Sequence, residues 1–207
     1  MSFLRTLVPK MLLCLGLLAK GCTEQGGTSA EEHARRVIPD RQVEESKLVY
    51  HPERSQWTWK DHPFSGYAVT YFPDGKPKTR FGVLDGKKQH HVLQWYPDGH
   101  LKSSMFYQQG RLHGTKKMWT SDPNHYLVAH YRYSNGRPHG VQFKWYPTGE
   151  LFKIMNLHHG RESGLQQAFR KNGARYANYE ARKGRIFGMK KAKLCYSLVE
   201  EQVKNKE

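Results

Sequence analysis

Residues 137–160 read RPHGVQFKWYPTGELFKIMNLHHG, and this stretch decides the fold. Apolar residues at every second position lie on both sides of a Pro-Thr-Gly sequence: Val141, Phe143 and Trp145, then Met155 and Leu157. Such alternation is typical of β-strands, because successive side chains point to opposite faces. Glycine supplies the positive φ that a tight hairpin turn requires. The stretch therefore predicts one β-hairpin.

The same pattern returns about every two dozen residues, marked by three series of glycines. Glycines of Pro-Asp-Gly turns or their relatives are 24, 50 and 24 residues apart: Gly75, Gly99, Gly149 and Gly173. Glycines that precede Lys or Arg are 24, 26, 24 and 24 apart: Gly86, Gly110, Gly136, Gly160 and Gly184. Four residues after these stands a third glycine, except where His90 replaces it, and Gly66 opens this series: Gly66, Gly114, Gly140, Gly164 and Gly188. The chain is thus a tandem repeat.

Five units follow from this register: about 63–86, 87–110, 111–136, 137–160 and 161–188. We expect an all-β fold, an antiparallel meander of about ten or eleven strands that forms one elongated, curved sheet roughly 45 Å long. Residues 48–62 are expected to cap its first hairpin. Residues 190–207 are expected to form a C-terminal cap, as one more strand or a short helix, and a charged tail. Glycine is missing at position 90, where His90 stands, and near residue 124. We therefore expect these two hairpins to be distorted.

One position of the repeat is aromatic in every unit: Tyr71, Trp95, Trp119, Trp145 and Phe169. We call this set the aromatic ladder. Aromatic side chains at matching positions of neighbouring strands stabilise a sheet by about 0.2–1 kcal/mol per pair. We interpret the ladder as part of the core and not as a ligand cage.

In the repeat, the motif G-x-x-x-Y/W-Y-x-x-G-x-L alternates with the motif N-G-x-x-x-G. This pattern resembles the MORN-type repeat. It is more similar still to the variant repeat of the bacterial YwqK-type toxin–antitoxin antitoxins. The resemblance covers about residues 48–189. It implies hairpin modules that serve as scaffolds, as membrane-associating modules or as partner-binding surfaces, and fold alone does not choose among these roles.

The N-terminus has the features of an export signal. Arg5 and Lys10 precede the apolar run MLLCLGLLA, which is too short to span a bilayer. The following Gly21-Cys22 resembles a bacterial lipobox, whose cysteine is acylated, although Lys20 departs from that pattern. We expect a lipoprotein signal peptide at 1–21 and a lipid-anchored flexible tether at 22–47, in the bacterial cell envelope at the outer membrane facing the periplasm. A secreted or periplasmic protein and an uncleaved chain are the alternatives.

Composition and motifs argue against catalysis. The 207 residues carry 34 Lys+Arg against 18 Asp+Glu, a formal charge of +16. With 37% apolar and 13% aromatic residues, 19 Gly and 10 Pro, this composition excludes a polytopic membrane protein, a coiled coil and a collagen. No nucleophile elbow, P-loop or C-x-x-C occurs, and Asp74 and Asp98 stand in turns, where aspartate is favoured for backbone reasons. We therefore expect a protein that is not an enzyme and needs no cofactor.

Twelve histidines raise the question of a metal site. His158-His159 is an adjacent pair, but neighbours on a strand point to opposite faces and rarely chelate one ion. His113 and His139 recur in the same turn, which duplication explains. We therefore predict no metal site. Cys195 with nearby histidines remains the alternative, a periplasmic metal-handling protein.

Basic residues gather toward the C-terminus. The candidates for binding an anionic surface are Lys171, Arg175, Arg182, Lys183, Arg185, Lys190, Lys191 and Lys193. Upstream, Lys116, Lys117, Lys144 and Lys153 add to this charge. Such charge often only keeps a strand-rich protein soluble, and the export signal argues against nucleic acid as the partner.

These features together predict a non-catalytic, membrane-anchored scaffold that binds a partner protein or an anionic membrane surface. An antitoxin that neutralises a cognate toxin by direct binding is the first alternative. The metal-handling protein is the second.

Overall fold

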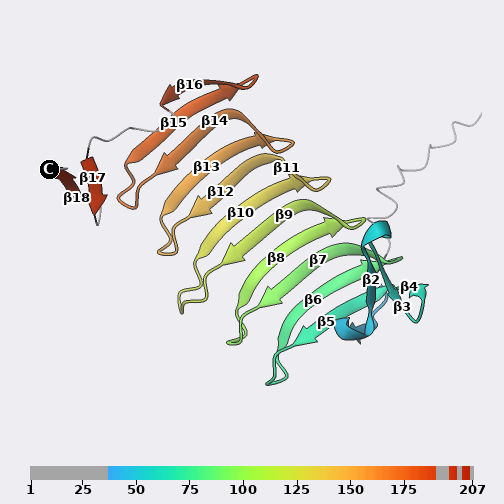
Figure 1. Ribbon diagram of the computed structural model, residues 1–207. Helices are drawn as coiled ribbons and strands as arrows, with labels where there is room; N and C mark the ends of the chain where they lie inside the picture. The colour runs from blue at the N-terminus through green and yellow to red at the C-terminus, as the bar shows by residue number, and fades with distance from the viewer. Residues whose placement is uncertain (1–36, 190–195, 200–201, 206–207) are drawn as a thin grey trace, which may run out of the picture.

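The computed structural model describes residues 37–189, 196–199 and 202–205. Their main body is one long, curved sheet, with a small N-terminal sheet at one end (Figure 1). The central strands are β5 (Gly66–Tyr71), β6 (Pro77–Leu84), β7 (Lys87–Trp95), β8 (Leu101–Gln108), β9 (Arg111–Trp119), β10 (Leu127–Ser134), β11 (Arg137–Pro138), β12 (Gly140–Trp145), β13 (Leu151–His158), β14 (Arg161–Phe169), β15 (Arg175–Arg182) and β16 (Arg185–Met189). Among the described residues, no helix is long and apolar enough to cross a membrane.

The central sheet has 13 strands in the order β1-β5-β6-β7-β8-β9-β10-β12-β13-β14-β15-β16, with β11 paired to β10. From β5 to β16 every pair of neighbours is antiparallel, as hairpins that follow one another in sequence require. The predicted all-β meander of tandem hairpins is confirmed.

The second glycine series forms the tight turns between the units. Each glycine follows a residue that is also left-handed, such as Asn135 with φ 49° before Gly136 with φ 81°. Two successive residues with positive φ define the hairpin turn whose twist matches that of the strands. Four of these turns also bond to the start of their own unit; for example, Gly136 N donates to Leu112 O at 2.8 Å and Gly160 N donates to Pro138 O at 2.7 Å. These bonds tie the two ends of a unit together.

The third glycine series marks β-bulges inside the strands. Gly114, Gly140 and Gly164 have φ between 70° and 86°, and the pairing register shifts at these points. His90, which replaces glycine in this series, adopts the same conformation with φ 61°. The register shifts there too, because Phe81 lies opposite Val92 and Gly82 opposite Gln89. The bulge at His90 therefore repeats the geometry of the other units.

Buried glutamines stand at these bulges, and two of the three, Gln142 and Gln166, make the same bonds. The side chain of Gln142 accepts a hydrogen bond from Arg132 N at 2.9 Å and donates one to Arg132 O at 3.0 Å. Gln166 makes the same pair of bonds with the backbone of Asn156, at 3.1 and 2.7 Å. Each glutamine thus replaces the cross-strand bonds that the bulge removes, which explains why a polar side chain is buried there.

The two faces of the sheet differ. Directly opposite residues share a face, and register places Ala68, Phe81, Val92, Met105, Lys116 and Tyr131 in one row on the first face. We call this the capped face. The aromatic ladder lies on the other, the ladder face. Tyr71 is 47% exposed and the other four ladder residues are half-buried, so the expectation that the ladder forms the core is wrong.

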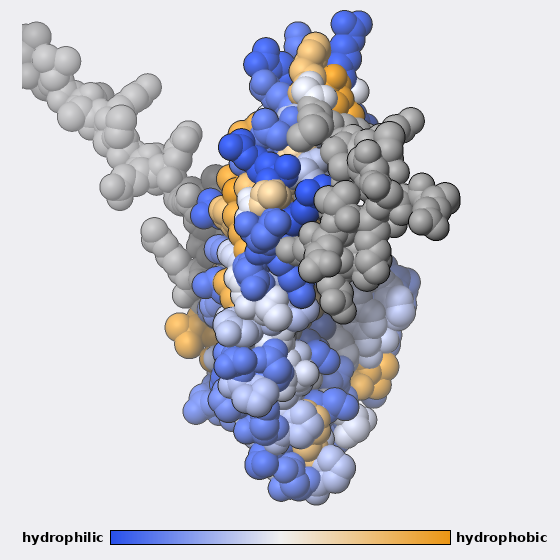
Figure 2. Space-filling model, turned by 90° about the vertical axis from the view of Figure 1, so that its left-hand side faces the viewer, coloured by the Kyte–Doolittle hydropathy of each residue, from blue (hydrophilic) through white to orange (hydrophobic). Residues whose placement is uncertain are grey.

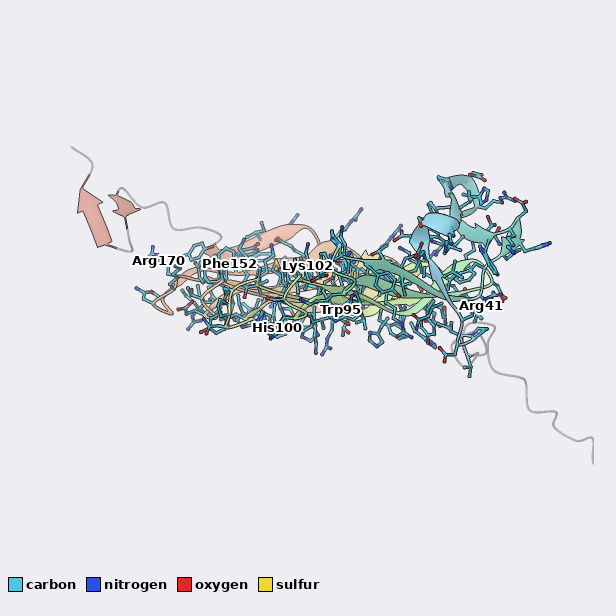
Figure 3. The ribbon with its side chains drawn as sticks, turned by 90° about the horizontal axis from the view of Figure 1, so that it is seen from below. Arg41, Trp95, His100, Lys102, Phe152 and Arg170 are labelled. Carbon is cyan, nitrogen blue, oxygen red and sulfur yellow. The ribbon has the colours of Figure 1, made fainter. Side chains whose placement is uncertain are left out.

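The main core lies instead on the capped face at the N-terminal end, where Phe64, Phe81 and Val83 are almost fully buried. A three-stranded sheet covers this part: β2 (Val49–His51), β3 (Gln56–Trp59) and β4 (His62–Pro63). Trp57 of β3 packs its ring 5.2 Å from that of Phe81. Figure 3 shows the small sheet rising from one side of the long one. We call it the cap.

The folded body begins earlier than residue 48. β1 (Gln42–Glu44) pairs in parallel with β5, and two short 3₁₀ helices, η1 (Glu45–Lys47) and η2 (Pro52–Arg54), flank β2. Ile38 and Val43 are 4% and 8% exposed. The tether predicted for 22–47 is therefore wrong for residues 37–47, because Ile38 lies against Gly82 of β6 and Val43 pairs with Ala68 of β5. Their sequence shows no periodicity that would have predicted this.

At the C-terminus, β17 (Tyr196–Val199) and β18 (Gln202–Asn205) pair with each other in a separate two-stranded sheet. The predicted single strand or short helix is thus replaced by a hairpin. Cys22 and Cys195 lie outside the described residues.

Candidate functional site

Charge is distributed unevenly between strands and turns. From β5 to β13 the strands contain no acidic residue. The acids of this region all lie in turns: Asp74, Asp85, Asp98, Asp122 and Glu150. The same strands carry these cations: Lys78, Arg80, Lys87, Lys88, Lys102, Arg111, Lys116, Lys117, Arg132, Arg137, Lys144 and Lys153. Both faces of the sheet between the turns are therefore cationic, and Figure 3 shows side chains projecting from either side of this thin layer.

Three of these cations lie on the capped face, beyond the cap. Lys144 of β12 lies directly opposite Lys153 of β13, and Lys116 of β9 lies opposite Met105 and Tyr131. Like charges directly opposite each other destabilise an antiparallel pair. On their other sides Lys144 faces Ala129 and Lys153 faces Ala168, and neither alanine carries a charge that could offset this repulsion. We call Lys116, Lys144 and Lys153 the lysine patch.

The lysine patch borders a shallow hollow of about 470 Å³. Lys153, Met155 and Tyr179 line it, together with the buried Gln166. The Tyr179 hydroxyl donates to Glu162 Oε1 at 2.8 Å. Burial first, and then this carboxylate, raise the pKa of Tyr179 to about 12. The hollow thus brings a cation and a neutral phenol together with the carboxylate of Glu162, which also lines it.

Other cations have structural partners in the cap. Lys88 Nζ lies 4.5 Å from the ring centroid of Phe81 and 5.5 Å from that of Trp57, and burial lowers its pKa. Lys87 Nζ donates to Ser55 O at 3.1 Å. These two lysines fasten the cap to the sheet and are not available to a partner.

The C-terminal cations that the sequence singled out do not form one patch. Lys171 and Arg175 lie at one end of β15, and Arg182, Lys183 and Arg185 lie at the other. Seven residue steps along a strand separate Arg175 from Arg182, about 23 Å. Arg182 is also engaged, since its guanidinium donates to both carboxylate oxygens of Glu180 at 2.5 and 2.7 Å, which lowers the pKa of Glu180. Lys190, Lys191 and Lys193 lie outside the described residues.

The ladder face has a cationic environment as well. Lys117 lies opposite His130, and Arg132 follows on the same strand. Burial first, and then Lys117 and Arg132, lower the pKa of His130. Tyrosines next to the ladder join neighbouring units, because Tyr96 Oη donates to Trp119 O at 2.9 Å and Tyr146 Oη to Phe169 O at 3.0 Å. Viewed from the left-hand side of Figure 1, the surface is mostly hydrophilic, with apolar residues in small separate groups (Figure 2).

Comparison with known proteins agrees with this geometry. Residues 91–109 and 138–159 match the family model described as MORN repeat variant. The first match covers part of β7 and the whole of β8, and the second runs from β11 through β13. A search of curated proteins finds no match. The fold and these matches define a protein that carries MORN variant repeats, a type of module that in general serves binding or membrane association.

Proposed function

We propose that this protein is a non-catalytic scaffold, anchored to a membrane, whose open sheet binds an anionic surface through the lysine patch. The observation that carries the proposal is the absence of any acidic residue in strands β5–β13, combined with the facing pair Lys144 and Lys153. A sheet built only for solubility would gain from mixed charges, because opposite charges across strands stabilise it.

A lipid bilayer is the anionic surface that fits the expected address. Near anionic lipid each Lys or Arg contributes about 1 kcal/mol of attraction, which salt screens within a Debye length. Acylation of Cys22 would supply a first anchor, and stable attachment is strengthened by a second, electrostatic one. The proposed location is the outer membrane of a bacterial envelope, facing the periplasm. Residues 37–189 would then rest one sheet face on the headgroups.

Vesicle co-sedimentation tests the electrostatic contact apart from the anchor. Residues 23–207, which lack the acylated cysteine, are mixed with neutral vesicles and with vesicles that contain phosphatidylglycerol. We expect binding to the anionic vesicles at about 0.1 M salt and its loss at about 0.5 M. Equal binding to both vesicle types would contradict the proposal.

A matched pair of variants locates the contact. The double variant Lys144→Gln/Lys153→Gln should bind about thirtyfold more weakly, since two cations of about 1 kcal/mol each are lost. The control Lys47→Gln/Lys76→Gln removes the same charge from residues that pair with Glu44 and Asp74. It should bind almost as the parent does. Equal losses in both variants would show that net charge, and not the lysine patch, drives binding.

The anchor is tested separately. Mass spectrometry of the membrane fraction should find a diacylated or triacylated Cys22 as the N-terminal residue. The variant Cys22→Ala should leave the membrane pool. An unmodified N-terminus, or a Cys22→Ala variant that stays in that pool, would overturn the lipoprotein proposal.

A protein partner is the second candidate function, and the edge strand β16 favours it. Among the described strands β16 pairs only with β15, and its Ile186 and Phe187 are 40% and 54% exposed. An open edge with apolar side chains can accept a strand from another chain. The resemblance to YwqK-type antitoxins makes a toxin the candidate. Co-expression with proteins encoded by the neighbouring genes tests it: the parent should rescue growth from a toxic neighbour, and Phe187→Glu should not.

A further inference from the structure

Three histidine rings meet where the fourth and fifth units join. His139 lies between β11 and β12, His158 ends β13, and His159 stands in the turn that follows. The ring centroids are 5.1 Å apart for His139 and His158, 4.8 Å for His139 and His159, and 4.5 Å for His158 and His159. One ring nitrogen from each lies within 4.8 Å of the others.

The turn explains why two neighbours in sequence can face the same point. His159 has φ 47° and is followed by Gly160 with φ 85°, so it belongs to a tight turn and not to a strand. The alternation of side chains that argued against chelation by His158-His159 does not apply at such a residue. The prediction that His158 and His159 point to opposite faces is therefore wrong.

Backbone bonds from two units hold the third ring in place. His139 N donates to Arg132 O at 2.9 Å, and Gly160 N donates to Pro138 O at 2.7 Å, which fixes the turn beside His139. The glycine bond recurs at Gly110 and Gly136, so the closeness of this turn to the start of its unit follows from the repeat.

The equivalent junction one unit earlier shows what distinguishes this one. There His113, Ser134 and Asn135 occupy the three positions, and Asn135 N donates to His113 Nδ1 at 3.4 Å. At the later junction His139 Nδ1 is buried from solvent and has no hydrogen-bond partner. His125 Nδ1 and His130 Nε2 are also buried without a partner, so the unpaired nitrogen of His139 supports a ligand only together with the two rings that face it.

We infer that His139, His158 and His159 form a three-histidine site for a divalent transition metal ion, with Zn²⁺ the best match. A tetrahedral ion with Zn–N distances of about 2.0–2.1 Å places the centroids of its imidazole ligands about 5 Å apart. The three centroid distances lie at or close to that value. Three protein ligands leave a fourth position, open to water or to a partner's side chain.

A second cluster shows why proximity alone does not suffice. Asp98, His100 and His125 also lie within 4.8 Å of one another. The rings of His100 and His125 are stacked, however, with centroids 3.5 Å apart and planes 14° from parallel. Lone pairs of imidazole nitrogens lie in the ring plane, so two nearly parallel rings at this spacing do not point at one ion. This cluster therefore provides an internal control.

Isothermal titration of the full chain in detergent, without a polyhistidine tag, tests the site with ZnCl₂ as the probe. We expect one tight equivalent. His139→Ala, His158→Ala and His159→Asn should each weaken Zn²⁺ binding more than about tenfold, since even outer partners of metal ligands contribute that much. Asparagine at 159 tolerates positive φ and preserves the turn. Circular dichroism of each variant should match the parent.

Matched controls identify the ligands. His113→Ala removes the histidine at the same repeat position one unit earlier, and His125→Ala removes one stacked ring; both should leave the tight equivalent unchanged. Loss of Zn²⁺ binding in Cys195→Ser, or unchanged binding in His139→Ala, would overturn the inference. His139→Ala should retain the binding to anionic vesicles. The metal site and the lysine patch are thus tested by separate measurements, and one proposal can be refuted without the other.

Discussion

The side chain of Gln142 bonds to both the N–H and the C=O of Arg132, at 2.9 and 3.0 Å, and it is 1% exposed. A buried backbone group that loses its partner costs about 1–3 kcal/mol. Gln142→Ala should therefore lower the free energy of unfolding by about 2–4 kcal/mol, measured by urea denaturation. Gln167→Ala is the control, because Gln167 bonds only the half-buried Asn178 side chain and should cost less than about 1 kcal/mol. Equal losses would show that the glutamine does not replace the backbone bonds of the bulge.

The interior glycine of β6 leaves room for the N-terminal segment. A Cβ on Gly82 would stand 2.4 Å from Ile38 Cδ1 and 2.7 Å from Gln89 O. Gly82→Ala should displace Ile38 and expose residues 37–44 to protease before the rest of the chain. Gly99→Ala, whose Cβ would meet nothing within 4 Å, should change stability only through its positive φ, by about 1 kcal/mol. Unchanged cleavage in Gly82→Ala would show that Ile38 does not depend on this space.

Damage to the core under the cap should remain local. Phe64 is 1% exposed and belongs to the core cluster with Phe81 and Val83. Phe64→Ala should cost about 3–5 kcal/mol. Because each repeat contacts only its neighbours, hydrogen exchange should accelerate in β5–β7 and stay unchanged in β13–β15. Acceleration along the whole sheet would contradict this one-dimensional order.

Acid should weaken the hairpin loops in a defined range. In Asp74 the Oδ1 atom accepts Lys76 N at 3.1 Å, and this backbone bond is the main reason that the pKa of Asp74 falls below its ordinary 3.8. A lowered native pKa means that the stabilisation is present above pH 3.8 and is lost as the pH falls through the native value. Tm should therefore drop as the pH is lowered below about 4.

Asp74→Asn separates the charge from the turn, because asparagine keeps the acceptor and does not titrate. The turn between β14 and β15 already shows this arrangement, with Asn172 Oδ1 accepting Ala174 N at 3.0 Å. The variant should show a smaller drop in Tm between about pH 4 and pH 2 than the parent. A drop of equal size would assign the acid sensitivity to other carboxylates, such as that of Asp98.

Much of the fold was predictable because it is local. The glycine intervals predicted hairpins of about two dozen residues, and each turn glycine has the positive φ that its position implied. The cationic candidates were less predictable. Nearness in sequence suggested one patch from Lys171 to Lys193. In the structure β15 separates Lys171 and Arg175, at its first end, from Arg182 and Lys183, at its second end. Lys144 and Lys153, nine positions apart, come face to face because a hairpin brings them into register.

Side-chain burial and the histidine cluster were not predictable from the pattern. Alternation shows that a strand has two faces, but it does not show which face the cap covers, and so the aromatic ladder was misplaced into the core. Adjacent histidines were judged by the rule for strands, whereas His159 lies in a turn. The residue before each glycine of the second series belongs to a tight turn that favours left-handed conformations. This signal could have placed His159 in a turn and not in a strand.

The sequence by itself determined the repeat, its turns and the antiparallel order of strands, because hairpins depend on interactions between residues close in the chain. Only the tertiary structure decided which face is covered, that residues 37–47 belong to the body, and that His139 meets His158 and His159. The first two features depend on contacts between separate segments of the chain, which no single repeat contains. The third depends on how strand register brings the two ends of the unit 137–160 side by side, which spacing along the chain does not show.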